Sequence, residues 1–442
     1  MLRRLTAFSL TLALLAGIAF GQADPWRQFA GTTIVVSWPA QYHFEVAAQF
    51  VDQFTAETGI EVELDVVEYL NMRDRQIVEI SKPGRGDLDV VTWVVFWKSE
   101  YVANNWLMPL APFLIDPRVT SPDYDIDDIV PAFLTTCCKV GGVKGYLDGP
   151  GASLFGIPFS PETSILMYRT DIFEEYGLEV PTTYDEMLET AEFITENVPN
   201  VYGMTTRGSA GHQVVHAWLL HLSPFGGTVL NDDFTPAVTS PQAIAATYAL
   251  QSILENSPPG MAAAGAGEQD AAFLQGDSAM YLDRSILAAQ AADPSRSRVV
   301  GNVGYALHPE QEQCGAETGG FAMGIPRNSQ NQGAAWLFVQ WFTSKRIDLE
   351  LAKAGANPTR TSTHADPELQ AMFPWYETVV EQLPCATADW RPLIPEWGAI
   401  NAPILGDEIS AALTGQKSIE DALESAARRI YELLDRSGYY SW

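Results

Sequence analysis

Segments that favour strands and segments that favour helices alternate through the first hundred residues of the chain. Residues 33–38 are a β-branched run, residues 44–58 carry apolar side chains at helical spacing, and residues 60–67 favour a second strand. A helix over 73–80 and a nearly continuous apolar run over 88–95 follow. Apolar runs of this kind are typical of parallel strands that are covered on both faces. The alternation therefore predicts an α/β layer architecture, in which ligands bind beyond the carboxyl ends of the strands.

Several later segments favour helices, and one favours a further strand. Thr182 or Thr183 can cap a helix over 186–197, whose acidic residues suit the positive end of the helix dipole. Residues 278–283 predict a strand that ends at Asp283. Other helices are expected over 241–255, 270–275, 333–344, 347–354 and 418–434. Because no flexible linker is evident, two lobes, where they exist, must share short connections.

The first residues of the chain combine a positive start with an apolar stretch. Arg3 and Arg4 precede a largely apolar run without acidic residues, and small residues follow, either Ala19 with Gly21 or Gly21 with Ala23. This three-part pattern predicts a secretory signal peptide. A membrane anchor would need about 20 uninterrupted apolar residues, and this run is shorter and contains glycines. Because no Cys follows that could carry a lipid anchor, we expect an exported, soluble protein that is periplasmic or extracellular.

The charge balance is strongly acidic and excludes one class of function. The chain has 442 residues, with 26 Lys and Arg against 55 Asp and Glu, and its formal net charge is −29. Proteins that bind nucleic acids by neutralising phosphates need a basic surface, so this class is excluded. Hydrophobic residues make up 47% of the chain, which is enough for a core and excludes a disordered acidic tail.

Export permits disulfides, and the chain has four cysteines. They are Cys137, Cys138, Cys314 and Cys385, which allow at most two bridges in three connectivities. A bridge between the adjacent Cys137 and Cys138 would close a strained ring, so partners elsewhere are favoured. The sequence does not decide among the connectivities, although our interpretation leans to Cys314 with Cys385. No papain-like or C-x-x-C pattern surrounds any of the four, which argues against a catalytic cysteine.

Two groups of potential metal ligands do not match known metal sites. His212 and His216 are four residues apart on one helical face, but Gln213 stands where a zinc protease needs Glu. The acidic run that begins at Asp123 is similar to the opening of a calcium loop, yet its sixth position is Asp128, where Gly is required. We therefore expect neither a metal site nor a cofactor.

Two long segments resemble a known family. Residues 154–171 read LFGIPFSPETSILMYRTD, and residues 179–187 read EVPTTYDEM. Both are similar to the extracellular solute-binding proteins of ATP-binding-cassette (ABC) sugar importers, the maltose-binding-protein-like group. Further similar blocks follow in the family's order over 276–283, 319–326, 335–343, 356–361, 391–397 and 419–434. The resemblance therefore covers nearly the whole chain after the predicted signal peptide.

The resemblance implies a periplasmic-binding-protein fold of two α/β lobes, with hinge crossovers and a central ligand cleft. A carbohydrate is then held in the cleft, and hinge bending closes the lobes over it. The membrane permease of the importer can distinguish the closed form from the open one. The resemblance also implies a monomer that is not an enzyme. The expected boundaries are a signal peptide over 1–23, an N-terminal lobe of 24–161 plus 309–360, and a C-terminal lobe of 162–308 plus 361–442, with crossovers near 160–165 and 307–310.

The expected ligand contacts of the first lobe are aromatic. A sugar needs planar polar partners for its hydroxyls and an aromatic ring against its C–H face. Trp38 closes the first predicted strand and Trp97 follows the third, so both are expected at strand ends that face the cleft. Packing into the core is the competing interpretation for any single Trp.

The expected contacts of the second lobe are mostly charged. Arg207 lies in a predicted loop, and Asp283 and Arg284 end a predicted strand. The resemblance implies that the stretch around Asp283 lines the cleft and that Trp397, which follows Pro-Glu, stacks on the sugar. The remaining candidate ligand contacts are Glu162, Arg360 and Glu396. A surface salt bridge is the competing interpretation for each charged residue.

Two functions from different classes fit these residues. The favoured one is the substrate-binding component of an ABC transporter, which captures a saccharide or polyol and delivers it to the permease. The alternative is a secreted carbohydrate-active hydrolase, which needs two carboxyl groups that face one bond. Residues 273–280, followed by 292–297, look similar to polyol-binding members of the family. The sequence alone does not decide which sugar or polyol is bound.

Overall fold

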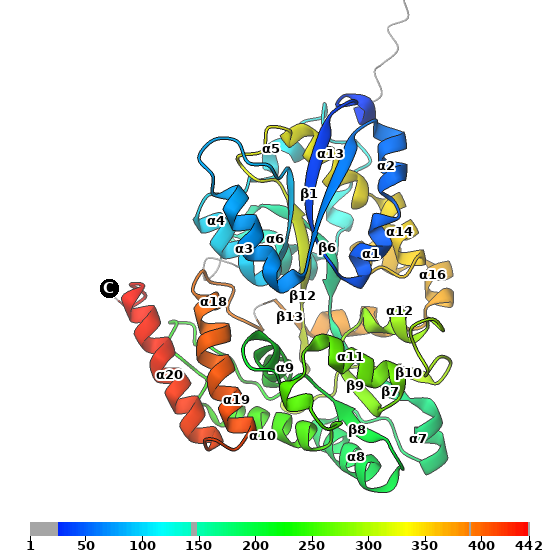
Figure 1. Cartoon of the computed structure of the whole chain (residues 1–442), viewed down its shortest axis with the longest axis vertical. Helices are drawn as coiled ribbons and strands as arrows, with labels where there is room; N and C mark the ends of the chain where they lie inside the picture. The colour runs from blue at the N-terminus through cyan, green and yellow to red at the C-terminus, as the bar shows by residue number, and fades with distance from the viewer. Residues whose placement is uncertain (1–24, 143–147, 389, 441–442) are drawn as a thin grey trace, which may run out of the picture.

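Two separate sheets divide the protein into two lobes. The computed structural model describes residues 25–142, 148–388 and 390–440, and Figure 1 shows one lobe above the other. The upper, first lobe contains a five-stranded sheet in the order β2-β1-β3-β12-β6. The lower, second lobe contains a four-stranded sheet in the order β10-β7-β9-β8. The predicted two-lobed α/β fold is therefore confirmed.

The first sheet combines parallel and antiparallel strands. β1 pairs in parallel with β2 and β3, as their apolar runs predict, while β12 pairs antiparallel with β3 and β6. The strands are β1 Thr33–Pro39, β2 Glu61–Val67, β3 Val90–Val94, β6 Gly156–Glu162 and β12 Gly319–Gly324. The helices of this lobe are α1 Tyr42–Ala48, α2 Val51–Thr58, α3 Tyr69–Ile80, α4 Lys98–Ala103, α5 Ala111–Leu114, α6 Pro131–Cys138, α13 Gln332–Phe342 and α14 Lys345–Lys353.

The segment predicted as one helix over 44–58 forms two helices, α1 and α2. Phe44 of α1 and Phe54 of α2 are both fully buried in the same aromatic core. Ten residues along a continuous helix turn by about 1,000°, which would set these two side chains about 80° apart. The break between the helices lets both rings reach the core.

The second sheet is mostly antiparallel. β7 pairs antiparallel with β10 and β9, and β8 pairs in parallel with β9. Thr183 caps α8, and the Glu186 side chain accepts from the Thr183 backbone N–H, so one of the two predicted caps is confirmed. The strands are β7 Ser164–Arg169, β8 Tyr202–Thr205, β9 Ser278–Arg284 and β10 Val303–Ala306. The helices around this sheet are α7 Thr170–Tyr176, α8 Tyr184–Asn197, α9 His212–Leu222, α10 Pro241–Glu255, α11 Ala266–Gln275, α12 Leu287–Ala291 and α17 Trp375–Gln382.

The last helices of the chain lie against the second lobe. α19 and α20 run side by side next to α10 at the lower left of Figure 1. The remaining helices are α15 Thr361–His364, α16 Pro367–Met372, α18 Trp397–Ile400, α19 Asp407–Leu413 and α20 Ile419–Arg436. Short helical turns are η1 Pro25–Arg27, η2 Val95–Trp97, η3 Ile126–Asp128, η5 Met261–Ala263, η6 Leu383–Cys385 and the π-helical η7 Asn401–Gly406. Short ladders join β4 Lys139–Val140 to β5 Ser153–Leu154, and β11 Ala316–Glu317 to β13 Ala386–Thr387.

The chain changes sheets at two places that lie side by side. It leaves the first sheet at Thr163, between β6 and β7, and returns between β10 and β12. The Thr163 hydroxyl donates to the Glu317 carbonyl at 2.8 Å, and the Glu317 N–H donates to the Ser164 hydroxyl at 3.1 Å. These bonds tie the two connections together at the level of the cleft. The finer lobe boundaries given above stay a prediction.

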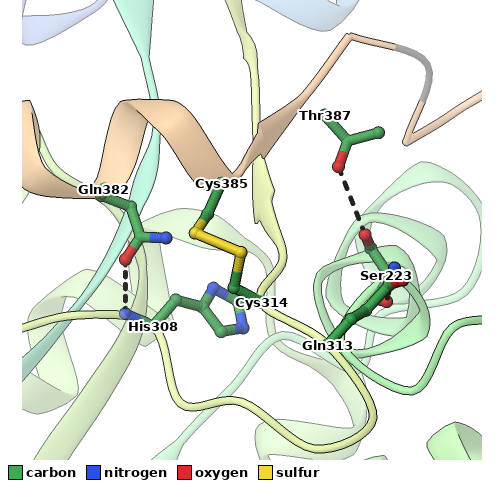
Figure 2. Close-up of a disulfide and its surroundings, with 7 residues drawn as sticks. All are labelled: Ser223, His308, Gln313, Cys314, Gln382, Cys385 and Thr387. Carbon is green, nitrogen blue, oxygen red and sulfur yellow. Dashed lines mark hydrogen bonds between the residues drawn. A yellow bond between two sulfur atoms is a disulfide. The ribbon is translucent and has the colours of Figure 1, made fainter.

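A disulfide joins Cys314 to Cys385 next to these connections, as our interpretation of the sequence favoured. Figure 2 shows it beside the bond in which the His308 N–H donates to the Gln382 side-chain oxygen at 2.7 Å. The bridge attaches the segment before β11 to the segment before β13, across 71 residues of chain. Cys137 and Cys138, by contrast, are buried free thiols at the end of α6.

The predicted signal peptide over 1–23 lies outside the described residues. Within the described ranges, no helix combines the length and the apolar character that a bilayer crossing requires.

Candidate functional site

A cavity of about 410 Å³ lies between the two lobes. The first lobe lines it with side chains that follow β1 and β2, among them Gln41, Tyr42 and Tyr69. The second lobe lines it with Arg284 at the end of β9 and with the first turns of α11. An inner pocket of about 40 Å³ continues from it and is also lined by Gln41, Tyr69 and Arg284. The carboxyl ends of strands from both sheets therefore face one cleft.

The inner pocket is lined by rings on one side and by cations on the other. Phe96, in the turn after β3, and Phe321 of β12 come from the first lobe. Arg207, which follows β8, and Arg391, which precedes α18, supply guanidinium groups. The pocket thus combines apolar faces with strong hydrogen-bond donors.

Asp283 organises the charges behind the inner pocket. Its carboxylate is fully buried and accepts two hydrogen bonds of 2.6 and 2.7 Å from the Nη2 of Arg207. It also accepts from His216 Nε2 at 3.1 Å and from the Arg284 backbone N–H at 2.8 Å. Burial opposes ionisation of Asp283, but the charge of Arg207 and the contact with His216 outweigh it and hold the pKa of this carboxyl well below its usual range. The group is an ionised, fully hydrogen-bonded anchor.

A second ion pair extends this network to the wall of the cavity. Arg284 donates to both oxygens of Asp270 in α11, at 2.8 and 2.9 Å. The Tyr281 hydroxyl donates to Asp270 at 2.9 Å. Strand β9 therefore fixes helix α11, which borders the cavity, through charged hydrogen bonds.

The tautomer of His216 follows from its partners. Arg391 lies 3.4 Å from His216 Nδ1, and a guanidinium can only donate, so Nδ1 accepts and Nε2 carries the hydrogen that faces Asp283. Burial lowers the pKa of His216 to about 3, so the ring is neutral. His216, Asp283 and Glu317 offer three ligand atoms within 4.8 Å of one another. A metal ion does not fit this set, because Nε2 holds a hydrogen and Arg207 occupies the carboxylate of Asp283.

Arg391 was not among the predicted ligand contacts, although it begins one of the blocks that resemble the family. Its guanidinium carbon lies 3.8 Å from the ring centre of Trp390 and 5.3 Å from that of Phe96. Burial lowers its pKa to about 10, so it stays charged at neutral pH. Among the described residues, no group accepts a hydrogen bond from its Nε. Its place at the start of the similar block over 391–397 was a sequence signal that could have identified this contact.

Two further carboxyl groups face the same cations. Glu162, at the end of β6, lines both the cavity and the inner pocket. Burial raises its pKa to about 7, although the charge of Arg284 opposes the rise. Glu317 of β11 lies behind the pocket, where burial, followed by the charges of Glu162 and Asp283, raises its pKa well above the usual range.

Four of the predicted site residues come together here. Glu162, Arg207 and Arg284 line the cavity or the inner pocket, and Asp283 holds Arg207 from behind. The structure therefore places Arg207, Asp283 and Arg284 of the second lobe in one cluster with Glu162 of the predicted crossover.

The three predicted tryptophans lie elsewhere. Trp38 is packed edge-on against four phenylalanine rings of the first-lobe core, and its indole N–H donates to the Phe44 carbonyl at 3.2 Å. Trp397 is fully buried in the hydrophobic cluster that also contains residues of α9, α10 and α20. Trp97 is also buried, and its neighbour Phe96 faces the inner pocket instead. Among the described residues, no tryptophan lines either cavity, so we correct the prediction of indole stacking.

Arg360 and Glu396 also have structural partners away from the cleft. Arg360 is fully buried in the first lobe, where it donates to the carbonyls of Thr343 and Asp125 at 2.7 and 2.6 Å. Glu396 accepts a hydrogen bond of 2.8 Å from the Tyr439 hydroxyl and so anchors the C-terminal segment. Neither residue lines the cavity.

Comparisons with known proteins agree with this geometry. The family model described as bacterial extracellular solute-binding protein matches residues 42–347. The mannitol-binding protein of Pseudomonas aeruginosa is 28% identical over 397 residues, which cover 85% of this chain and 86% of that protein. An ABC transporter solute-binding protein from Agrobacterium radiobacter, solved in complex with ribitol, has a TM-score of 0.81 and 28% identity, and the match covers 91% of this chain and 99% of that one. A second such protein, from Agrobacterium vitis with bound D-mannitol, has a TM-score of 0.80 and 26% identity, with 92% and 100% covered. The chain therefore belongs to the bacterial extracellular solute-binding protein family.

Proposed function

We propose that this protein is the substrate-binding component of an ABC importer and that it captures a sugar alcohol in the cleft between its lobes. The ligand leaves chemically unchanged when the protein delivers it to the permease. The protein acts outside the cytoplasmic membrane, after removal of the predicted signal peptide.

The observation that carries this proposal is the mixture of donors and acceptors around the cavity. Arg284 and Arg391 offer N–H groups, while Glu162 and Glu68 offer carboxyl oxygens. A hydroxyl group both donates and accepts, so a molecule with a hydroxyl on every carbon can satisfy both kinds of partner. A volume of about 410 Å³ lies in the range of small-molecule sites.

The lack of a tryptophan among the described residues of the cavity lining favours an open-chain ligand over a pyranose. A pyranose presents a C–H face that packs well on an indole, and in the described part of the chain no tryptophan lines the cavity. Tyr42, His43 and Tyr69 carry the rings there, and the Tyr69 hydroxyl accepts a hydrogen bond from Gln213 across the cleft. An acyclic polyol has no ring face, so it does not need such a platform. The ligands of the three similar proteins, mannitol, ribitol and D-mannitol, support the same class.

A hydrolase is less compatible with these carboxyl groups. A glycosidase needs an acid and a second free carboxylate on either side of one bond. Asp270 and Asp283 are instead engaged by Arg284 and Arg207. Their hydrogen bonds suit a rigid binding surface better than proton transfer or nucleophilic attack.

A thermal-shift screen over sugar alcohols, monosaccharides and oligosaccharides tests the proposal. A ligand that binds only the folded form raises the unfolding midpoint, by about 2.7 kcal/mol of stabilisation at a hundredfold excess over Kd. We expect D-mannitol, ribitol or a related alditol to give the largest shift. Chromatography of the recovered compound should show no product. A shift confined to oligosaccharides, or turnover of any glycoside, would contradict the proposal.

A further inference from the structure

The carboxyl group of Glu317 is buried at the point where the chain returns to the first lobe. Glu317 belongs to β11, is 1% exposed and pairs with Thr387 of β13. Within the described part of the chain, neither of its carboxyl oxygens has a hydrogen-bond partner. A buried carboxylate without hydrogen bonds is very unfavourable, whereas a neutral acid in the same place is tolerated. The geometry therefore favours a protonated Glu317.

The distances around Glu317 also favour a protonated carboxyl group. Its Oε2 lies 3.8 Å from Arg391 Nη2 and 3.7 Å from His216 Nε2, both beyond hydrogen-bond length. A charged carboxylate beside a guanidinium normally forms a short, often bidentate pair. Asp283 shows this arrangement with Arg207 at 2.6 Å in the same cluster. Glu317 and Arg391 do not show it.

The charges of the cluster balance only when one acid is neutral. Three guanidiniums, those of Arg207, Arg284 and Arg391, meet four carboxyl groups, those of Asp270, Asp283, Glu162 and Glu317. Asp270 and Asp283 are held by short ion pairs, whereas Glu162 and Glu317 form none among the described residues. Of these two, Glu317 is fully buried, and Glu162 is only half-buried at the cavity wall. The charged and titratable groups that face it are Glu162 from β6, Arg207 after β8, His216 from α9, Asp283 from β9 and Arg391 before α18.

Arg391 is free to act on a ligand as long as it is not drawn to Glu317. Its guanidinium lies over the rings of Trp390 and Phe96, and it lines the inner pocket. Among the described groups, its Nε has no acceptor. A ligand hydroxyl in the inner pocket can provide one.

We propose that Glu317 is a positioning residue, which as an uncharged carboxylic acid leaves the guanidinium of Arg391 facing the inner pocket and which, when ionised, draws it away from the ligand. This inference rests on the proposed capture of a sugar alcohol. Burial raises the pKa of Glu317 in this arrangement. The affinity for the sugar alcohol is therefore highest below that pKa and falls as the pH rises through it. The loss can reach about tenfold per pH unit, because one proton is linked to binding.

Infrared spectroscopy of the folded protein tests directly whether the carboxyl group of Glu317 is neutral. Wild type at pH 7 should show the carbonyl band of a protonated carboxylic acid, and Glu317→Gln should lack part of it. Glu408→Gln is the matched control, because Glu408 is a buried carboxyl that Lys417 and Arg429 hold away from the cleft. Identical bands in wild type and Glu317→Gln would overturn the proposal.

Calorimetric titration with D-mannitol and ribitol from pH 6 to pH 10 tests the role in binding. Wild type should lose affinity where the pH rises through the pKa of Glu317, by up to about tenfold per pH unit above it. Glu317→Gln, an uncharged isostere, should stay within about threefold of wild type at pH 6 and keep more of its affinity at pH 10. Glu408→Gln should follow wild type. A fall in wild-type affinity that Glu317→Gln shows to the same extent, or loss of the infrared band of Glu317 over this range without a fall in affinity, would overturn the proposal.

One measurement on wild type alone keeps the test decisive if a variant folds poorly. Titrations of wild type in buffers of different ionisation enthalpy should show proton uptake on binding at each pH where the infrared band of Glu317 is being lost, and no uptake there would overturn the proposal. If neither alditol binds at any pH, the proposed function fails, and the infrared band still decides whether Glu317 is neutral.

Discussion

The two sides of the cleft are built differently. The second lobe presents Arg207, Asp283 and Arg284, whose charged groups are locked to one another and to helix α11 by hydrogen bonds. The first lobe presents Gln41 and Tyr69, which are half-buried and make few contacts across the gap. Groups that are fixed before the ligand arrives lose little entropy on binding. We infer that the second lobe is the organised half of the site and that the first lobe closes over it.

The largest expected effect is loss of stability in acid, and it should affect the second lobe first. Five of the six histidines are buried. Burial lowers the pKa to about 3 for His216 and His308 and to about 4 for His221, all in or beside the second lobe. An unfolded histidine has a pKa of about 6.5, so the unfolded state binds more protons below that pH. Each such histidine should therefore cost up to about 1.4 kcal/mol per pH unit as the pH falls from about 6.5 toward these values.

Thermal unfolding from pH 7.5 to pH 4 measures this effect, and hydrogen exchange locates it. The unfolding midpoint should fall steeply below pH 6, with protection lost first around α9 and β9. The variant His308→Gln should show a shallower pH dependence, by about one proton. A midpoint that stays constant between pH 7 and pH 5 would refute the conclusion that these histidines are buried as neutral groups.

Asp283→Asn should break the organised half of the site. It leaves Arg207 buried without its charge partner, which typically costs about 3–5 kcal/mol of stability. Ligand affinity should fall by at least about a hundredfold, because Arg207 and Arg284 lose their fixed positions. Chemical denaturation and calorimetry measure the two effects.

The matched control for this substitution is in the first lobe. Asp348 is also buried, and it accepts hydrogen bonds from the Thr359 and Arg360 backbone at 2.9 and 3.2 Å. Asp348→Asn should lower stability and leave ligand affinity near that of wild type. Equal loss of affinity in both variants would mean that the two lobes do not differ as described.

Tyr69→Phe should affect the first-lobe side much less. It removes the hydroxyl that accepts from Gln213 at 3.2 Å across the cleft. The net value of such a bond is about 0.5–1.5 kcal/mol, so affinity should fall by about two- to tenfold, mostly through faster release. Stopped-flow release of the ligand measures this. A loss as large as that of Asp283→Asn would show that closure, and not the second-lobe network, dominates affinity.

The smallest effect is expected at the mouth of the cleft. Arg296 pairs with Glu45 at 2.9 Å and lies 4.9 Å over the ring of Tyr42, but the charged side chains are 41% and 54% exposed. Exposed pairs of this kind contribute about 0–1 kcal/mol. Arg296→Gln should change Kd by no more than about fivefold at low salt and by less at high salt. A tenfold change at high salt would indicate a stronger contact between the lobes than the structure contains.

The fold was predictable because its signals are local. The β-branched run of β1, the continuous apolar run of β3 and the cap at Thr183 each determine an element within a few residues. Asp283 and Arg284 were singled out because the resemblance to the family implies that this stretch lines the cleft, and the structure places them at the end of β9, whose carboxyl end faces the cavity.

The aromatic contacts were not predictable, because side-chain direction depends on packing between distant segments. Trp97 and Phe96 are adjacent at the end of β3, and only the turn η2 decides that Phe96 faces the pocket. Trp38 also ends a strand, yet phenylalanines from α1, β6 and α13 enclose it. Arg391 lies in an irregular segment without periodicity, so the sequence pattern carried no signal for its direction.

Calorimetric titration of the wild-type protein with D-mannitol and ribitol near pH 6.5, followed by mass spectrometry of the released compound, tests the central claim most directly. The account predicts saturable binding of one alditol per chain, with the compound recovered intact. No heat of binding for any alditol, or recovery of a chemically altered compound, would contradict it.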